Sequence, residues 1–478
     1  MTPATYPATY PASISQRLLW QAAFRSAAGA TGTPRQYAIR DLDAPALQRA
    51  LSELRSRHEA LRTRLVGSGP RLTQEIHEPG EFPVEWIDGD TDEGTTGEGA
   101  GNGNGTGTGT GTGEKGPAPD APDAPDTLDS PATPGRGRPE REVLARVWRR
   151  PGVSSLVLDV DHLLTDAWSG NVLGAELGHL YAACREGREP ELPPVGWQYR
   201  HFTEWQLGRL NGPALHRLQE AWLTRLAGAE PVRLPQPDHR VPRRERTAVL
   251  QRFQAGEATA GALADLGAAG GTTPASAATT MFLLQLGLVS GQDDICIGSV
   301  FANRANVRSW RSVGLFAHLV PLRLALGADL TLWELLRSGH EMMTHALVNQ
   351  ELPMSLLPAG ALRRDTAIGV NSTVINMMPA GTGGAGRPAG ENAVAPVPGR
   401  MPTGARFDFE LGLLSPSSRM DGFIRYAADR FTAEWVEEFR NGLFDLIRTG
   451  AADVGLTLGQ LRKRCLWRLE RLRSAEGR

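Results

Sequence analysis

The chain has 478 residues, of which 40% are hydrophobic and 22% are charged, and its formal net charge at pH 7 is −2. A chain of this length can form two domains or two large lobes. The near-neutral charge argues against a nucleic-acid partner, which would require a strong basic excess or a basic stripe.

The three cysteines, Cys184, Cys296 and Cys465, lie far apart and match no zinc-binding spacing or disulfide framework. Scattered thiols are typical of a reducing compartment. The N-terminus lacks the charged start and apolar run of a signal peptide, and no stretch approaches the roughly 20 apolar residues that span a bilayer. We therefore expect a cytoplasmic protein with no metal site and no membrane segment.

The first predicted element is an amphipathic helix over residues 46–65. One side of it carries Leu47, Leu51, Leu54, His58, Leu61 and Leu65 at helical spacing. Residues 71–78 and 82–87 follow as predicted strands. Residues 89–138 consist mostly of Gly, Thr, Pro and Asp, with almost no side chain to bury. This composition predicts a disordered, low-complexity insertion inside one lobe, where a long surface loop costs little.

After the insertion, residues 141–148 are expected to form a short helix. Residues 154–161 alternate between apolar positions on one face and mixed positions on the other, which predicts a strand. Residues 169–184 are predicted to be helical. The stretch "DHLLTDAWS", from Asp161 to Ser169, therefore lies at a strand-to-helix junction, close to any cleft at the strand end.

A Pro- and Gly-containing break at residues 185–197 separates the two halves of the chain. The second half contains both helical and strand patterns. Helices are expected at residues 212–228, 276–291 and 331–347, strands at 294–302 and 313–326, and a basic C-terminal helix at 457–474. This last helix could dock a partner, but its basic charge is better explained by a solvated face.

Within "DHLLTDAWS", His162 is the side chain best suited to move a proton near neutral pH. Asp166 can cap the following helix or pair with an arginine, and Ser169 can also act as a cap. A histidine at a strand end is more often structural than catalytic. The spacing of these residues alone therefore does not predict an enzyme.

The segment from Asp161 to Ala167 resembles HHxxxDG, the central motif of the condensation domains of nonribosomal peptide synthetases. His162 and Asp166 match the second histidine and the aspartate of that motif. Asp161 stands in place of the first histidine, and Ala167 stands in place of the glycine. The resemblance covers nearly the whole chain, because further family motifs follow in the family's order. They are "SISQRLLW" (13–20), "RHEALRTRL" (57–65), "QYRHFTEWQ" (198–206), "IGSVFANR" (297–304) with "VGLFAHLVPLRL" (313–324), "NQELPMSLL" (349–357), and "FDFELGLL" with "GFIRYAADRF" near the end.

The resemblance implies an α/β fold of two chloramphenicol-acetyltransferase-like lobes that form a V with a central tunnel. We place the lobes at residues 1–184 and 185–478. His162 is then the catalytic residue, and it assists transfer of an acyl or aminoacyl group to an amine or hydroxyl acceptor. The substrates would arrive in trans on the phosphopantetheine arms of acyl or peptidyl carrier proteins, or as a small-molecule acceptor. The chain itself is expected to bind no cofactor, and the enzyme would be free-standing.

In the family, the aspartate of the central motif pairs with an arginine that fixes the loop. Arg304 is the first candidate partner for Asp166, and Arg62 is the second. The sequence does not distinguish between them.

Three further positions follow from the resemblance. His318 stands where the family has asparagine, and with Trp168 it is predicted to line the tunnel. Asp161 is interpreted as a tolerated substitution, because neighbouring side chains of a strand point to opposite faces and it need not contact His162. Ala167 adds a methyl group where glycine would allow a backbone amide to approach a substrate.

Two alternatives remain open. Asp161, Asp166 and Ser169 also match DxxxxDxxS, the motif of heterocyclisation domains, which condense and then cyclodehydrate cysteine, serine or threonine. The altered motif also fits a catalytically silent module that recruits a tailoring enzyme or a carrier protein. Retention of His162 and Asp166 favours catalysis over the silent module.

Overall fold

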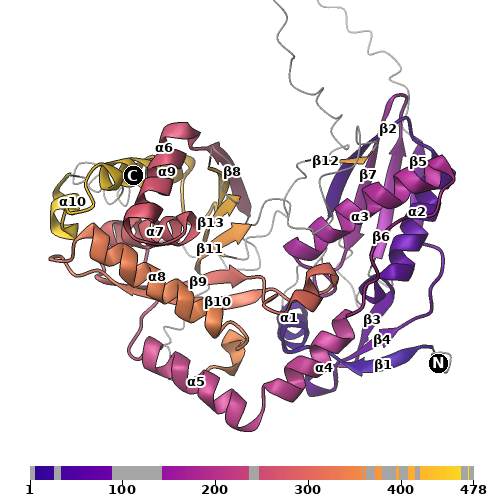
Figure 1. The fold of residues 1–478 in the computed structure, drawn as a ribbon, viewed down its shortest axis with the longest axis horizontal. Helices are drawn as coiled ribbons and strands as arrows, with labels where there is room; N and C mark the ends of the chain where they lie inside the picture. The colour runs from indigo at the N-terminus through magenta and orange to yellow at the C-terminus, as the bar shows by residue number, and fades with distance from the viewer. Residues whose placement is uncertain are drawn as a thin grey trace, which may run out of the picture.

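A computed structural model shows two α/β lobes, each with its own large β-sheet (Figure 1). The two lobes approach each other around α1 and β10 and spread apart toward β2 and β8. The structure describes residues 6–25, 34–88, 143–235, 247–358, 360–361, 372–378, 394–397, 407–414, 420–464 and 472. The insertion predicted at residues 89–138 lies outside the described residues.

The first lobe contains a five-stranded sheet of order β12-β2-β7-β6-β5 and a three-stranded sheet of order β1-β4-β3. Helices α2 and α3 contact each other along their length and pack on the larger sheet. Its strands are β1 (Ala8–Pro11), β2 (Arg35–Arg40), β3 (Thr63–Val66), β4 (Thr73–Ile76), β5 (Val84–Asp88), β6 (Val143–Arg149) and β7 (Val153–Val160). Its helices are α1 (Ile14–Arg25), α2 (Ala44–Arg57), η1 (Glu59–Arg62), η2 (Gly69–Arg71), α3 (Ala167–Glu186) and α4 (Tyr199–Arg209).

The second lobe contains a six-stranded sheet of order β10-β9-β11-β13-β14-β8. Figure 1 shows helices α6, α7 and α9 on the side of this sheet that lies away from the first lobe. Its strands are β8 (Ala248–Gln254), β9 (Asp294–Phe301), β10 (His318–Ala325), β11 (Thr373–Met378), β13 (Phe409–Leu414) and β14 (Asp421–Ala427). Its helices are α5 (Gly212–Leu226), α6 (Gly256–Ala269), α7 (Pro274–Ser290), η4 (Val307–Arg311), α8 (Leu332–Val348), η5 (Met354–Leu356), α9 (Ala433–Ala452) and α10 (Leu458–Arg464).

The core of the first lobe includes segments from beyond residue 184. Tyr199 and Phe202 of α4 are buried in it, as is Phe316 from the loop before β10. In addition, β12 (Val394–Val397) pairs with β2 in the antiparallel direction. Each lobe has its own core, but the second half of the chain contributes to both of them.

Most of the predicted elements are confirmed, and two are corrected. Residues 143–149 form strand β6 instead of the predicted helix. Val143, Ala145 and Val147 are buried in the core at every second residue, and the backbone pairs with β5 and β7. The segment is therefore a strand, although the spacing of its apolar residues is also compatible with a helix.

The predicted helix over residues 46–65 ends at Arg57. His58 leaves the helix in an extended conformation, and its buried imidazole Nε2 lies 2.8 Å from Glu176 Oε2 of α3. All six residues predicted for the apolar side are buried, so their burial is confirmed and only the secondary structure differs. Of the predicted C-terminal helix, residues 458–464 are described as helical. Among the described residues, no helix is both long enough and apolar enough to cross a bilayer.

Gly314 allows the loop before β10 to reach the core of the first lobe. A Cβ atom at this position would lie 2.0 Å from Cδ2 of the buried Tyr199 ring, so no larger residue fits without moving that ring. Gly178 on α3 is different, because nothing lies within 4 Å of the position of its Cβ atom.

These two glycines give a matched test of the loop packing. Gly314→Ala is expected to lower the free energy of unfolding by about 1–3 kcal/mol, because the buried ring of Tyr199 cannot shift freely. Gly178→Ala is expected to raise it by about 0.5–1 kcal/mol, because alanine is favoured over glycine inside a helix. Urea unfolding of both variants measures the difference, and equal gains in stability would contradict the close packing of Gly314.

Candidate functional site

The loop from Asp161 to Asp166 connects the end of β7 to the start of α3. The carboxylate of Asp161 accepts a hydrogen bond from the Leu163 amide at 2.8 Å, and the Leu164 amide donates to the carbonyl of Asp161 at 2.8 Å. At the other end, Asp166 is the N-cap of α3, and its Oδ1 accepts from the Ser169 amide at 2.7 Å. The two carboxylates of the predicted motif therefore shape the turn at both ends.

The side chain of His162 is half-buried, and its Nδ1 atom lies 3.1 Å from the carbonyl oxygen of Thr165. A carbonyl oxygen only accepts hydrogen bonds, so Nδ1 must carry the hydrogen of the neutral ring. The lone pair of the neutral imidazole is then on Nε2. This arrangement leaves His162 in the tautomer of a base that acts through Nε2.

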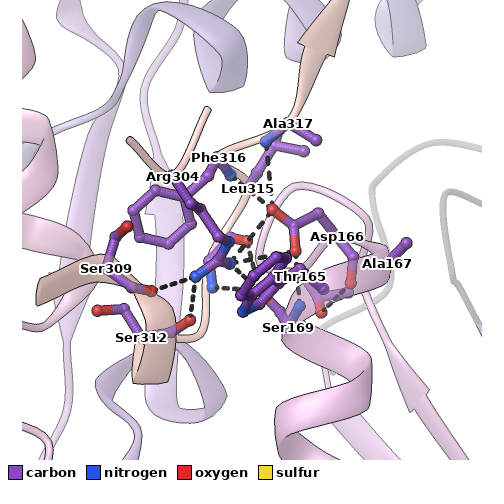
Figure 2. Close-up of polar contacts among 12 residues, drawn as sticks. Thr165, Asp166, Ala167, Ser169, Arg304, Ser309, Ser312, Leu315, Phe316 and Ala317 are labelled. Atoms are coloured by element: carbon purple, nitrogen blue, oxygen red, sulfur yellow. Dashed lines mark hydrogen bonds and ion pairs between the residues drawn. The ribbon is translucent and has the colours of Figure 1, made fainter. Parts of the chain in front are cut away.

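Asp166 is buried where the two lobes meet (Figure 2). Its carboxylate lies 3.2 Å from Nη2 of Arg304, and both side chains are only 2% exposed. Its Oδ2 atom also accepts from the amides of Phe316, at 3.0 Å, and Ala317, at 3.2 Å. A buried carboxylate requires this many partners to offset its loss of water.

The guanidinium of Arg304 connects the loop that carries His162 to η4. Its Nη1 donates to the carbonyls of Ser309 and Ser312, the latter at 2.9 Å. Its Cζ lies 4.0 Å from the centre of the Phe316 ring, an arrangement that favours a cation over an aromatic face. Burial lowers the pKa of Arg304, and the nearby Asp166 opposes this shift.

Ser169 is fully buried and links α3 to the loop before β10. Its hydroxyl donates to the Gly314 carbonyl at 2.8 Å and accepts from the Gly314 amide at 3.1 Å and from Arg304 Nη2 at 2.8 Å. Figure 2 shows Ser169 and Asp166 approaching Arg304 from the same helix end. Every hydrogen-bonding position of this hydroxyl is therefore used by the fold.

Three of the other family-like motifs contact this loop or one another. Nε2 of Gln16 donates to the Leu163 carbonyl at 3.0 Å. The Tyr199 hydroxyl lies 2.6 Å from the Leu315 carbonyl and 2.8 Å from Ser13 Oγ. Burial raises the pKa of Tyr199, so its hydroxyl remains a donor. The motif at residues 13–20 thus contacts the loop through Gln16, and Tyr199 joins this motif to the segment at residues 313–324.

Of the two arginines considered for Asp166, the structure brings Arg304 to it and places Arg62 elsewhere. Nη1 of Arg62 donates to the carbonyl of His77, and the guanidinium lies 5.4 Å from the centre of the Tyr6 ring. Ala167 is exposed on the first turn of α3. Nε1 of the neighbouring Trp168 donates to the Trp310 carbonyl at 2.9 Å.

His318 begins β10, directly after Ala317. Its Nδ1 lies 3.2 Å from the Leu319 carbonyl. Burial lowers the pKa of this imidazole, so its neutral form is favoured. The tunnel that His318 and Trp168 were predicted to line stays a prediction.

Sequence reasoning missed Arg35, which lies on β2. Its Nη2 donates to the Ala167 carbonyl at 2.9 Å, and its guanidinium occupies the space where a side chain at Gly170 would lie, with Nε only 1.8 Å from the Cβ position. Arg35 belongs to no motif. The only signal in the sequence is the glycine at position 170, on the first turn of α3.

Asp159, two residues before Asp161, is a second feature that the motif did not indicate. Its Oδ1 atom is buried and has no hydrogen-bond partner among the described residues. Burial raises the pKa of this carboxyl group, Arg146 opposes the shift, and Asp161 adds to it. Within the same described residues, no group of three or more His, Cys, Asp or Glu side chains is arranged to hold a metal ion.

Comparison with known proteins identifies relatives in peptide biosynthesis. A family model described as "Condensation domain" matches residues 149–461. Phosphinothricin tripeptide synthetase PhsB of Streptomyces viridochromogenes is 31% identical over 295 residues, which cover 61% of this chain and 25% of that protein. Malpinin synthetase of Mortierella alpina is 28% identical over 367 residues, which cover 74% of this chain and 4% of that protein. The chain thus spans a quarter or less of the length of these two relatives.

Solved structures share the fold. The X-domain from teicoplanin biosynthesis superimposes with a TM-score of 0.74 at 20% identity, covering 96% of this chain and 98% of that chain. The first condensation domain of the CDA synthetase superimposes with a TM-score of 0.67 at 14% identity, covering 95% of this chain and 99% of that chain. The expected α/β fold of two chloramphenicol-acetyltransferase-like lobes is therefore confirmed.

The buried ion pair between Asp166 and Arg304 predicts that truncating one of its side chains strongly lowers the free energy of unfolding. Asp166→Ala leaves the cation of Arg304 buried without a carboxylate and is expected to lower the free energy of unfolding by about 3–5 kcal/mol. Glu186→Ala is the control, because its pair with Arg188 is about half exposed and should contribute about 1 kcal/mol or less. Chemical denaturation compares the two, and similar losses would contradict the central role of the buried pair.

Asp159 predicts a dependence of stability on pH. Because its pKa is raised in the fold, its ionisation destabilises the folded state at a pH above that raised pKa, and the penalty disappears as the pH falls below its unfolded pKa of about 3.9. Asp159→Asn is expected to raise the melting temperature at pH 7 and to give no gain near pH 4. The exposed Asp329→Asn variant is the control. A gain for Asp159→Asn that is the same at both pH values would contradict this assignment.

Proposed function

This chain belongs to the condensation-domain family, and from this membership we propose that it transfers an acyl or aminoacyl group from a carrier-protein thioester to an amine acceptor. The product is an amide, or an ester when the acceptor is a hydroxyl group. The observation that carries the proposal is the contact between His162 Nδ1 and the Thr165 carbonyl, because it leaves the lone pair of the neutral imidazole on Nε2.

The reaction requires one proton acceptor. An α-amino group has a pKa of about 8, so a useful fraction is neutral near pH 7. Its nitrogen attacks the thioester carbon, and Nε2 of His162 takes a proton from this nitrogen as the tetrahedral centre forms. The carbon–sulfur bond then breaks, and the proton passes to the departing sulfur, which leaves as the thiol of the phosphopantetheine arm. A hydroxyl acceptor hardly ionises in water, so it would depend more strongly on the same base.

The remaining residues of the motif are positioning residues in this proposal. Asp166 and Arg304 hold the loop that carries His162, through side chains that are 2% exposed. Asp161 closes the turn by accepting from the Leu163 amide. A loop that is fixed before the substrates arrive needs little reorganisation when they bind, which favours reaction between two oriented groups.

The heterocyclisation motif has a structural explanation in this chain. Asp161 contacts the Leu163 amide, Asp166 contacts Arg304, and the hydroxyl of Ser169 contacts Gly314 and Arg304. Each of the three side chains thus has a role in the fold that does not require cyclodehydration.

A silent recruiting module is the second candidate. The X-domain from teicoplanin biosynthesis, which has the same fold, was solved in complex with OxyB, at 20% identity to this chain. The departures at Asp161 and Ala167 favour this candidate, and the retained His162 favours catalysis. The proposal also includes a cytoplasmic location, substrates that are brought by carrier proteins, and no cofactor held by this chain.

The proposed base predicts the effect of one substitution. His162→Ala is expected to reduce amide formation by about 10²- to 10⁴-fold, because a positioned general base contributes a factor of this size. His179→Ala is the control. His179 is half-buried on α3, outside the loop of His162, so its substitution should leave the rate unchanged. A panel of aminoacyl-loaded carrier proteins with amine acceptors, followed by intact-protein mass spectrometry, measures the product.

Two outcomes of this experiment would overturn the catalytic proposal. Product formation that is equal in wild type and His162→Ala would remove the base from the mechanism. An absence of product from wild type with every donor, together with tight binding of carriers or of a tailoring enzyme, would favour the recruiting module.

A further inference from the structure

The short helix η4 exposes an unusual set of side chains beside the loop of His162. Val307 is 67% exposed and Trp310 is 47% exposed, although both are large and apolar. Arg308, which lies between them in the sequence, is exposed, and Arg311 is half-buried. We call the side chains of Val307, Arg308, Trp310 and Arg311 the η4 surface.

The backbone under the η4 surface is fixed. Arg304 Nη1 donates to the carbonyls of Ser309 and Ser312, and Asn306 caps the helix by accepting from the Arg308 amide at 3.1 Å. Nε1 of Trp310 donates to the Arg304 carbonyl at 3.0 Å. An exposed tryptophan that is already held in place loses little conformational freedom when a partner covers it.

The η4 surface lies next to the reaction site. The Trp310 carbonyl accepts from Nε1 of Trp168, and the centres of the two indole rings are 6.2 Å apart. Trp168 is on the first turn of α3, which begins directly after Asp166. The same Arg304 side chain contacts both η4 and Asp166, so it joins the surface to the loop of His162.

The charged side chains of the segment between Asp294 and Asp329 are all positive. The sequence has no acidic residue between Asp294 and Asp329, and it has four arginines there: Arg304, Arg308, Arg311 and Arg323. Arg304 is paired with Asp166 and Arg323 with Asp294. No carboxylate of the described residues forms an ion pair with Arg308 or Arg311. The η4 surface therefore combines apolar area with two uncompensated positive charges.

We propose that the η4 surface docks a carrier protein at its phosphopantetheine attachment point. The arm is joined to its carrier through a negatively charged phosphodiester, which complements Arg308 and Arg311. Apolar side chains of the carrier around this point would cover Val307 and Trp310, and tryptophan and arginine are the residues that most often dominate binding at interfaces. This inference rests on the proposed function, since it assumes that a carrier brings one of the substrates.

The second lobe offers matched controls. Val348, at the end of α8, is 71% exposed. Arg337 lies on the same helix, with its Cζ 5.3 Å from the centre of the exposed Trp333 ring. Helix α8 packs against α7 and β10 of the second lobe, so substitutions on its exposed side change the same residue types away from the proposed docking surface.

The test compares Val307→Asp and Arg308→Glu with Val348→Asp and Arg337→Glu. Each variant is assayed with an acyl-loaded carrier protein that wild type accepts, and with the same acyl group on free pantetheine, which has neither a carrier nor a phosphate. We expect the η4 variants to raise the KM for the loaded carrier about tenfold or more. Their turnover of acyl-pantetheine should equal that of wild type, and both control variants should match wild type with both donors.

The possible failures can be distinguished. If wild type makes no amide from either donor, the proposed function fails. If wild type is active and the η4 variants use the loaded carrier as well as wild type does, the docking inference is overturned and the proposed function stands. If the η4 variants lose activity equally with both donors, η4 acts through the fold of the site, and the docking inference is again overturned.

Discussion

The buried ion pair between Asp166 and Arg304 is the interaction on which the rest of the site depends. Removing two charges from water costs several kcal/mol per ion unless each is paired and hydrogen-bonded. The chain meets this requirement with the amides of Phe316 and Ala317 on one side and the hydroxyl of Ser169 on the other. These groups come from α3 and from the loop before β10, so satisfying one carboxylate fixes the junction between the lobes.

The reactive group itself is a small part of this arrangement. Nδ1 of His162 contacts the Thr165 carbonyl, within a turn that the carboxylate of Asp161 and the side-chain amide of Gln16 stabilise. An activated thioester requires orientation and one proton acceptor more than it requires a nucleophilic residue. The distribution of side chains agrees with this requirement, because most of the motif residues position the loop and His162 alone is placed to take a proton.

The two departures from the central motif have different meanings in the structure. Asp161 makes a local hydrogen bond to the Leu163 amide that suits an aspartate at a turn, so the substitution carries its own structural role. Ala167 is exposed on the first turn of α3, and its carbonyl accepts from Arg35. Trp168, on the same turn, contacts helix η4, which carries Arg308 and Arg311, so this side of the loop is apolar and basic.

The sequence by itself determined most of the helices and strands and the place of His162 at a strand-to-helix junction, because alternation and helical spacing are local properties. The α/β fold followed from the resemblance of its motifs to those of the condensation-domain family. The strand at residues 143–149 could not be predicted from spacing alone, since its pattern fits both periods and pairing with β5 and β7 decides between them. Only the tertiary structure decided that Arg304, 138 residues from Asp166, is its partner while Arg62 contacts His77. The approach of Arg35 to Ala167 and the position of η4 were also beyond the sequence, because contacts between distant segments depend on the path of the whole chain and not on any local pattern.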